Sequence, residues 1–204
     1  MGLILLVYVA VRGMPGRTAD SEMPLPRVAH VPSFTLTERS GRTVTDRDLL
    51  GRVWVADFFF TLCSGPCPTL SLRMRSLQES IRRFEGKVKL VSFSVDPTYD
   101  RPPVLRAYAN RYHADADLWW FLTADDEETM YAVVRNGFMQ AVSRASKTAP
   151  VIHSTRFVLV DAEGYIRAWF NGEDAASKPK ILRAIERLLA EASADQRPPA
   201  ETQQ

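Results

Sequence analysis

Cysteine is scarce in this chain, which has two cysteines among 204 residues. Two cysteines cannot supply the several disulfide bonds that hold small secreted domains together. A clustered basic stripe is also absent, because the 26 Lys and Arg residues are interspersed with 24 Asp and Glu residues. Nucleic-acid binding requires such a stripe. We therefore exclude a disulfide framework and expect no nucleic-acid partner.

The chain also lacks an apolar run long enough to cross a bilayer. Residues 2–11 are an uninterrupted apolar run near the N-terminus. A helix of that length rises about 15 Å, which is half of a hydrocarbon core of about 30 Å. No basic segment precedes this run, and Tyr8 stands where a signal-peptide cleavage site needs a small residue. We interpret residues 1–12 as part of a membrane anchor whose upstream portion is absent from this sequence, or as a hydrophobic arm.

Composition divides the rest of the chain into three parts. Residues 13–32 contain four prolines and no hydrophobic period, which predicts a linker. Residues 193–204 are polar, which predicts a disordered tail. Between them, residues 33–192 are expected to form one folded domain, because the overall content of 46% apolar and 25% charged residues is typical of globular proteins.

Hydrophobic periodicity predicts alternating strands and helices within that domain. Segments 33–37 and 43–45 predict an N-terminal β-hairpin, and the continuous apolar run 53–60 predicts a central strand covered on both faces. The other expected strands are 88–95, 119–122, 156–160 and 166–170, and the expected helices are 68–84, 100–112, 125–136 and 178–192. This order indicates an α/β fold with a mixed central sheet and flanking helices.

The two cysteines stand where the first central strand leads into its helix, in Cys63-Ser-Gly-Pro-Cys67-Pro68. A helix N-terminus lowers a thiol pKa, which predisposes both sulfurs to act as nucleophiles or metal ligands. Residues four apart on a helical turn have Cβ atoms about 5–6 Å apart, whereas a relaxed disulfide needs about 3.8 Å. Two sulfurs on one metal ion lie about 4.0–4.6 Å apart. The spacing therefore favours metal binding, and two soft thiolates favour Cu(I) over hard cations.

A third ligand would come from one of the three histidines of the chain. His30 falls in the expected linker, His113 falls at the end of a polar helix, and His153 directly precedes an expected strand. A lone histidine is more often a structural residue than a ligand, so spacing alone leaves both readings of His153 open.

Taken together, these residues resemble the Sco/SenC family of copper chaperones for cytochrome c oxidase. The matching segments are Phe60-Thr-Leu-Cys63 through Pro68, Ser94-Val-Asp-Pro97, Asp100 through Leu105, and His153 through Asp161. The resemblance implies a thioredoxin-like fold in which Cys63, Cys67 and His153 bind copper. It also implies a role for Asp96 beside the site or in docking, although a turn carboxylate before Pro97 is an equally good reading.

The resemblance further implies delivery of copper to the CuA site of cytochrome c oxidase subunit II, and we expect this subunit or another copper-receiving protein as the partner. It places the protein at the bacterial inner membrane facing the periplasm, or at the mitochondrial inner membrane facing the intermembrane space. We expect a carrier with no catalytic residue. The alternative is a thiol–disulfide oxidoreductase that reduces partner cysteines, although the Cys-x3-Cys spacing and His153-Ser154 in place of a proline disfavour a general one. A structural disulfide is the third reading.

Overall fold

The computed structural model describes residues 24–144, 146 and 151–195. Its main sheet contains β1 (Ala29–His30), β2 (Thr35–Glu38), β3 (Thr43–Thr45), β4 (Val53–Phe59), β5 (Val88–Ser94), β6 (Trp119–Thr123), β9 (Arg156–Val160) and β10 (Tyr165–Asn171). The spatial order is β1-β10-β9-β4-β5-β6-β2-β3. A separate two-stranded sheet pairs β7 (Val142–Ser143) with β8 (Ile152–His153).

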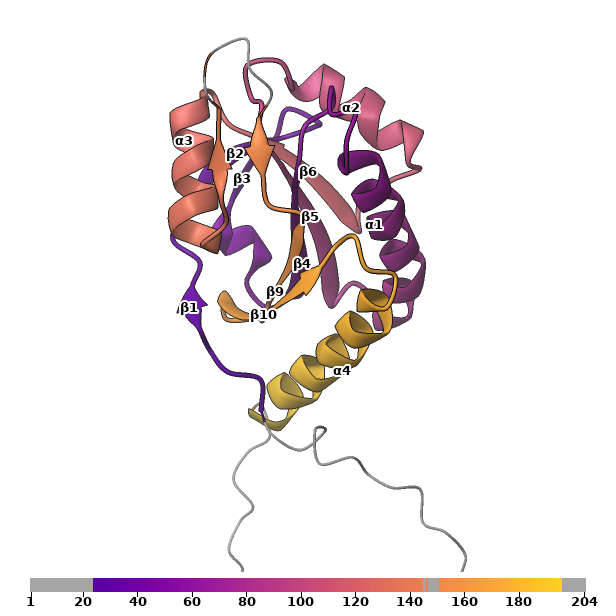
Figure 1. Ribbon diagram of the computed structural model, residues 1–204. Helices are drawn as coiled ribbons and strands as arrows, with labels where there is room; N and C mark the ends of the chain where they lie inside the picture. Colours follow the sequence, from indigo (N-terminus) through magenta and orange to yellow (C-terminus); the bar gives the residue numbers. More distant parts are fainter. Residues whose placement is uncertain (1–23, 145, 147–150, 196–204) are drawn as a thin grey trace, which may run out of the picture.

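Strands β4, β5 and β6 form the parallel centre of the main sheet, and β9 joins β4 in antiparallel register (Figure 1). Val55 of β4 lies between Leu90 of β5 and Leu159 of β9. Every residue of β4 and β5 is buried, as a parallel strand covered on both faces requires. The predicted mixed sheet is confirmed, with its parallel strands ending at one common edge.

Helices cover both faces of the sheet (Figure 1). The helical elements are α1 (Cys67–Ile81), α2 (Pro102–Arg111), α3 (Glu127–Ala132) and α4 (Ser177–Asp195), the 3-10 turns η2 (Asp46–Leu49) and η3 (Arg82–Phe84), and the π-helical turn η4 (Val133–Gly137). One apolar cluster joins the sheet to α1, α2 and α4, and a second joins it to α3 and η4. On α1 the buried residues Leu70, Met74, Leu77 and Ile81 face the sheet, each contributing about 1.5–3 kcal/mol by burial.

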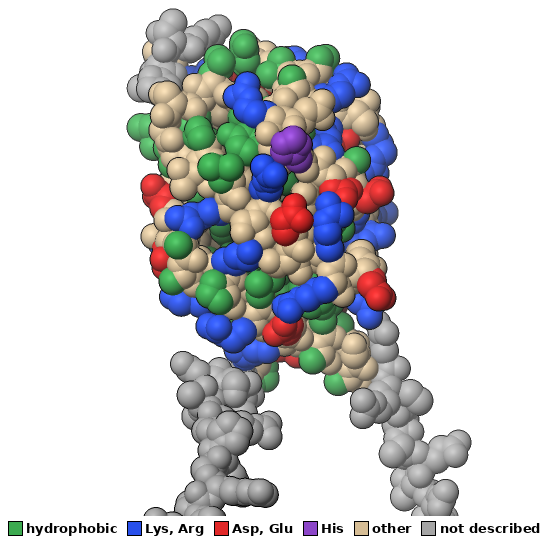
Figure 2. Space-filling model, turned by 90° about the vertical axis from the view of Figure 1, so that its right-hand side faces the viewer, with side chains coloured by type: hydrophobic (Ala, Val, Ile, Leu, Met, Phe, Trp, Pro, Cys, Tyr) green, Lys and Arg blue, Asp and Glu red, His purple; other side chains and the backbone are tan. Residues whose placement is uncertain are grey.

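The outer face formed by α1, α2 and α4 carries basic and acidic side chains in a mixed arrangement (Figure 2). Some of these charges pair across helices: Arg83 Nη2 of η3 lies 2.6 Å from Glu186 Oε1 of α4. Arg82 Nη1 lies 3.0 Å from Asp115 Oδ2. Exposed pairs of this kind contribute about 0–1 kcal/mol each, so the apolar cluster beneath them dominates the stability of this layer.

The folded part of the chain extends beyond the expected domain bounds at both ends. Ala29 pairs with Ile166 of β10, and Val31 is buried in the core, so the last part of the expected linker 13–32 belongs to the folded domain. At the other end, α4 continues to Asp195, beyond the expected limit of 192. The sequence signal was weak in both places because a two-residue strand has no measurable period and a polar last turn resembles a tail.

Within the part of the chain that the structure describes, no helix is both long and apolar enough to cross a membrane. The expected anchor at 1–12 and most of the expected tail lie outside the described residues.

Candidate metal centre

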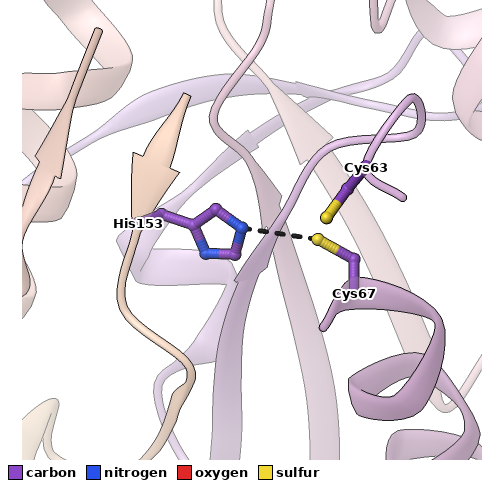
Figure 3. A group of neighbouring side chains, drawn as sticks. All are labelled: Cys63, Cys67 and His153. Atoms are coloured by element: carbon purple, nitrogen blue, oxygen red, sulfur yellow. Dashed lines mark hydrogen bonds between the residues drawn. The ribbon is translucent and has the colours of Figure 1, made fainter. Parts of the chain in front are cut away.

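Three different elements bring the predicted ligands together at the end of the central strands. Cys63 lies in the loop after β4, Cys67 is the first residue of α1, and His153 is the last residue of β8. The two sulfurs and a ring nitrogen lie within 4.8 Å of one another. Figure 3 shows all three side chains pointing toward a common centre. His30, by contrast, contacts the backbone carbonyls of Val31 and Glu163.

The cysteine loop is shaped by prolines and by a buried carboxylate. Pro66 and Pro68 stand at the first turn of α1, where a missing N–H costs nothing because helix-start amides have no intrahelical partner. Before the cysteines, the N–H of Thr61 donates to Asp100 Oδ2 at 3.0 Å, and its hydroxyl donates to Asp100 Oδ1. Asp100 is fully buried. The loop that carries Cys63 is therefore held by the turn that follows β5.

The hairpin of β7 and β8 presents His153. Val142 pairs with His153 in this hairpin, and the N–H of Ser154 donates to the carbonyl of Ala141 at 3.1 Å. His153 Nδ1 lies 2.9 Å from the carbonyl oxygen of Ser154. Since a carbonyl only accepts, Nδ1 carries the proton and Nε2 keeps its lone pair, so Nε2 is the acceptor toward Cys67. Nε2 lies 3.4 Å from Cys67 Sγ.

Burial sets the protonation of the metal-free site. It raises the pKa of the Cys67 thiol well above its ordinary value, with the neighbouring Cys63 thiol adding to the effect. Burial also lowers the pKa of His153, against the opposing effect of the Ser154 carbonyl. The expectation that the thiol pKa is lowered is therefore wrong for Cys67, because loss of solvent is the largest effect on its pKa and raises it.

The donor set fits a soft metal ion. Both cysteines are free thiols, and the imidazole is neutral with its lone pair directed at them. Metal bonds of about 2.3 Å to sulfur and about 2.0 Å to nitrogen fit three donor atoms at these separations after small side-chain adjustments. Two thiolates with one imidazole suit Cu(I), whereas Mg²⁺ and Ca²⁺ prefer oxygen ligands.

An ion pair beside the site was not predicted. Arg144 Nη2 lies 2.9 Å from Asp96 Oδ1, and Arg144 Nη1 lies 2.9 Å from Glu127 Oε1. Asp96 therefore faces an arginine, with its side chain only 12% exposed. The resemblance had pointed to Asp96 but gave no sign of Arg144, whose partners are distant in the sequence. Asp100 could have been found, because it stands in a matching segment.

The fold and the site together define a thioredoxin-like α/β protein with two free thiols and an imidazole at one edge of its sheet. A model of the SCO1/SenC family matches residues 23–190, and the chain belongs to this family. The resemblance and the thioredoxin-like fold expected from the sequence are both confirmed.

Individual relatives agree with this placement. The "SCO1 protein homolog" of Bacillus subtilis is 32% identical over 90% of this chain and 92% of its own length. A "putative copper-binding protein" of Stutzerimonas stutzeri is 27% identical over 81% of this chain and 78% of its own length.

Solved structures are similar in fold as well. A SCO1/SenC family lipoprotein from Bacillus anthracis has a TM-score of 0.74 at 32% identity, covering 78% of this chain and 95% of that one. BsSco, described as a member of the Sco family of cytochrome c oxidase assembly proteins, has a TM-score of 0.70 at 31% identity, covering 78% and 92%.

Proposed function

We propose that this protein is a copper chaperone that binds Cu(I) through Cys63, Cys67 and His153 and delivers it to the CuA site of cytochrome c oxidase subunit II. The observation that carries the proposal is the convergence of two sulfurs and one imidazole nitrogen within 4.8 Å. Membership in the SCO1/SenC family supports it. So do relatives described as copper-binding and as oxidase assembly proteins.

Loading of the site requires that the ion replace thiol protons. Cys67 is protonated in the metal-free protein because burial raises its pKa, and a thiol must lose its proton to become a metal ligand. His153 needs no proton change, since burial already favours its neutral form. Copper binding therefore releases the Cys67 proton, and the loaded site holds the negative charge of the thiolates.

Release follows from the unequal exposure of the donors. Cys67 is fully buried, whereas Cys63 is partly exposed. A ligand from the recipient protein reaches the ion first on the side of Cys63. It replaces this partly exposed donor before the bond from the buried Cys67 sulfur to the ion breaks. A site with three ligands leaves an open position for such an exchange, unlike a closed tetrahedral zinc site.

Competition with a chromophoric Cu(I) chelator tests the binding step. We expect one tightly bound ion per reduced chain and a loss of affinity of at least tenfold in His153→Ala, whereas His113→Ala, an exposed histidine outside the site, matches wild type. Equal affinities in the two histidine variants would refute the ligand set.

The delivery step needs its own experiment. Copper-loaded protein is mixed with the metal-free soluble domain of subunit II, the two are separated, and copper is counted in each. Transfer to the recipient, and none to a recipient whose CuA cysteines are replaced by serine, is the expected result. Copper that stays on the chaperone in both mixtures would contradict delivery.

A second candidate function is thiol–disulfide exchange with partner cysteines. The specific observation is that both thiols are free and adjacent, with the partly exposed Cys63 placed to attack and the buried Cys67 placed to resolve the mixed disulfide. BsSco, at 31% identity, is described as having a disulfide switch. Reduction of a generic disulfide by the copper-free protein at thioredoxin-like rates would make this the primary activity.

We also propose that the protein works at a membrane, on the periplasmic side in bacteria or in the mitochondrial intermembrane space. The lipoprotein from Bacillus anthracis and the mitochondrial Sco relative of Saccharomyces cerevisiae, 27% identical, support this placement. Fractionation of the native protein in its own cells tests it, and recovery in the cytosolic fraction would contradict it.

A further inference from the structure

The hairpin that presents His153 is not part of the main sheet. Strands β7 and β8 hydrogen-bond to each other in a separate two-stranded sheet, beside α3 in Figure 1. Buried apolar residues and polar side-chain contacts attach this hairpin to the rest of the domain. Arg135 donates to the carbonyl of Val142 at 2.6 Å through Nη2, and Ser154 Oγ donates to Gln140 Oε1 at 2.7 Å.

Arg144 adds the contact that links this hairpin to the opposite side of the site. It directly follows β7, and its guanidinium bridges Asp96 after β5 and Glu127 at the start of α3, at 2.9 Å each. The Arg144 side chain is 13% exposed. A planar guanidinium can hold two carboxylates in fixed directions, which a flexible lysine ammonium does less well.

Asp96 stands in the same turn that holds the cysteine loop. The N–H of Asp100 donates to the carbonyl of Asp96 at 2.9 Å, and Asp100 in turn accepts from the backbone and hydroxyl of Thr61, just ahead of Cys63. The turn formed by residues 96–100 therefore holds the cysteine loop through Asp100 and the β7–β8 hairpin through Asp96. Arg144 completes the connection.

We propose that Arg144 is a positioning residue for His153: by bridging Asp96 and Glu127 it fixes the distance between the imidazole and the two cysteine sulfurs. This inference rests on the proposed copper function. Arg144 does not touch the ion. It acts through the hairpin, because Val142 of β7 pairs with His153 and lies two residues from Arg144.

Copper affinity of arginine variants is the first test. Groups that orient a metal ligand typically change affinity by about 10- to 100-fold when they are removed, so we expect Arg144→Met to weaken Cu(I) binding by about that factor and Arg144→Lys to recover part of the loss. The matched control is Arg82→Ala, since Arg82 also pairs with two carboxylates, Glu79 and Asp115, but beyond the other end of α1 from Cys67. It should bind as wild type does.

A double-mutant cycle separates positioning from general loosening of the fold. In a His153→Ala background, where two cysteines remain, Arg144→Met should leave copper affinity unchanged within about twofold, because its effect passes through the missing imidazole. An equal loss in both backgrounds would overturn the inference. Wild-type affinity in Arg144→Met would overturn it as well, while leaving the proposed function intact.

Hydrogen exchange in the metal-free protein supplies a readout that does not depend on copper. The amide of Ser154 donates to Ala141 across the hairpin, so it should exchange faster in Arg144→Met and at the wild-type rate in Arg82→Ala.

If Arg144→Met fails to fold, Glu127→Gln replaces it, since it removes one of the two ion pairs and should give a smaller change in the same direction. An unchanged Ser154 rate would overturn the inference. Failure of wild type to bind copper would overturn the proposed function and this inference together, whatever that rate.

Discussion

His153 Nε2 lies 3.4 Å from Cys67 Sγ, although 86 positions separate the two residues in the chain. No covalent bond holds them together, since both cysteines are free thiols. Their separation depends on hydrogen bonds from Thr61 to Asp100 on one side and on the Arg144–Asp96 ion pair on the other. A donor set held by such contacts suits the release of the ion that the proposed delivery requires.

The two thiols should differ in reactivity toward an alkylating reagent. Cys67 is fully buried and its pKa is raised by that burial, and the thiolate is the reactive form. The Cys63→Ser variant retains only Cys67, and the Cys67→Ser variant retains only Cys63. We expect iodoacetamide to modify the Cys63→Ser variant at least about ten times more slowly than the Cys67→Ser variant. Mass spectrometry at matched times measures both rates.

Alkylation in concentrated urea is the control for this comparison, because both single-cysteine variants should react alike once unfolded. Equal rates in the native proteins would contradict the burial of Cys67.

Asp57 should make the protein less stable as pH rises. Its side chain is fully buried on β4, and burial raises its pKa from 3.8 to about 7 although a hydrogen bond from Ser92 opposes the shift. The fold therefore favours the protonated acid. The contribution of Asp57 to the free energy of unfolding is greatest below pH 4 and falls as the pH rises through 7. The loss is up to about 4 kcal/mol, at about 1.4 kcal/mol for each pKa unit.

Urea unfolding of wild type and Asp57→Asn across pH 4–8 measures this effect. The amide oxygen can still accept from Ser92, and the variant does not ionise. We expect the difference in unfolding free energy, variant minus wild type, to grow in favour of the variant as pH increases. A difference independent of pH would contradict the raised pKa.

Gly172 should not tolerate a side chain. A Cβ at this position would lie 2.4 Å from the Thr155 carbonyl oxygen and 2.5 Å from Leu70 Cδ2, closer than atoms can pack. We expect Gly172→Ala to lower the free energy of unfolding by about 1–3 kcal/mol, as overpacking does. Gly65→Ala is the matched control, because a Cβ there would meet only Cys63 Sγ at 3.9 Å. Equal stability of the two variants by denaturant unfolding would refute this packing.

The central strands and α1 could be predicted because their signals are long. Strand β4 is apolar at every position except Asp57, and apolar residues recur every three or four positions along the buried face of α1. Strands β1, β7 and β8 contain two residues each, which is too short for a period to appear. The hairpin that carries His153 was therefore missed even though His153 itself was named from the family resemblance.

The environment of the site could not be predicted from local sequence. The position of Cys67 at the start of α1 suggested a lowered thiol pKa, but its burial comes from the packing of distant segments and raises it. Arg144 likewise gains its role from Asp96 and Glu127, which reach it only after the sheet and α3 have packed.

Extended X-ray absorption of the Cu(I)-loaded, reduced protein measures the proposed ligand set itself. We expect two sulfur ligands at about 2.3 Å and one nitrogen at about 2.0 Å, with the nitrogen lost in His153→Ala and kept in His113→Ala. An identical coordination sphere in wild type and His153→Ala would contradict it.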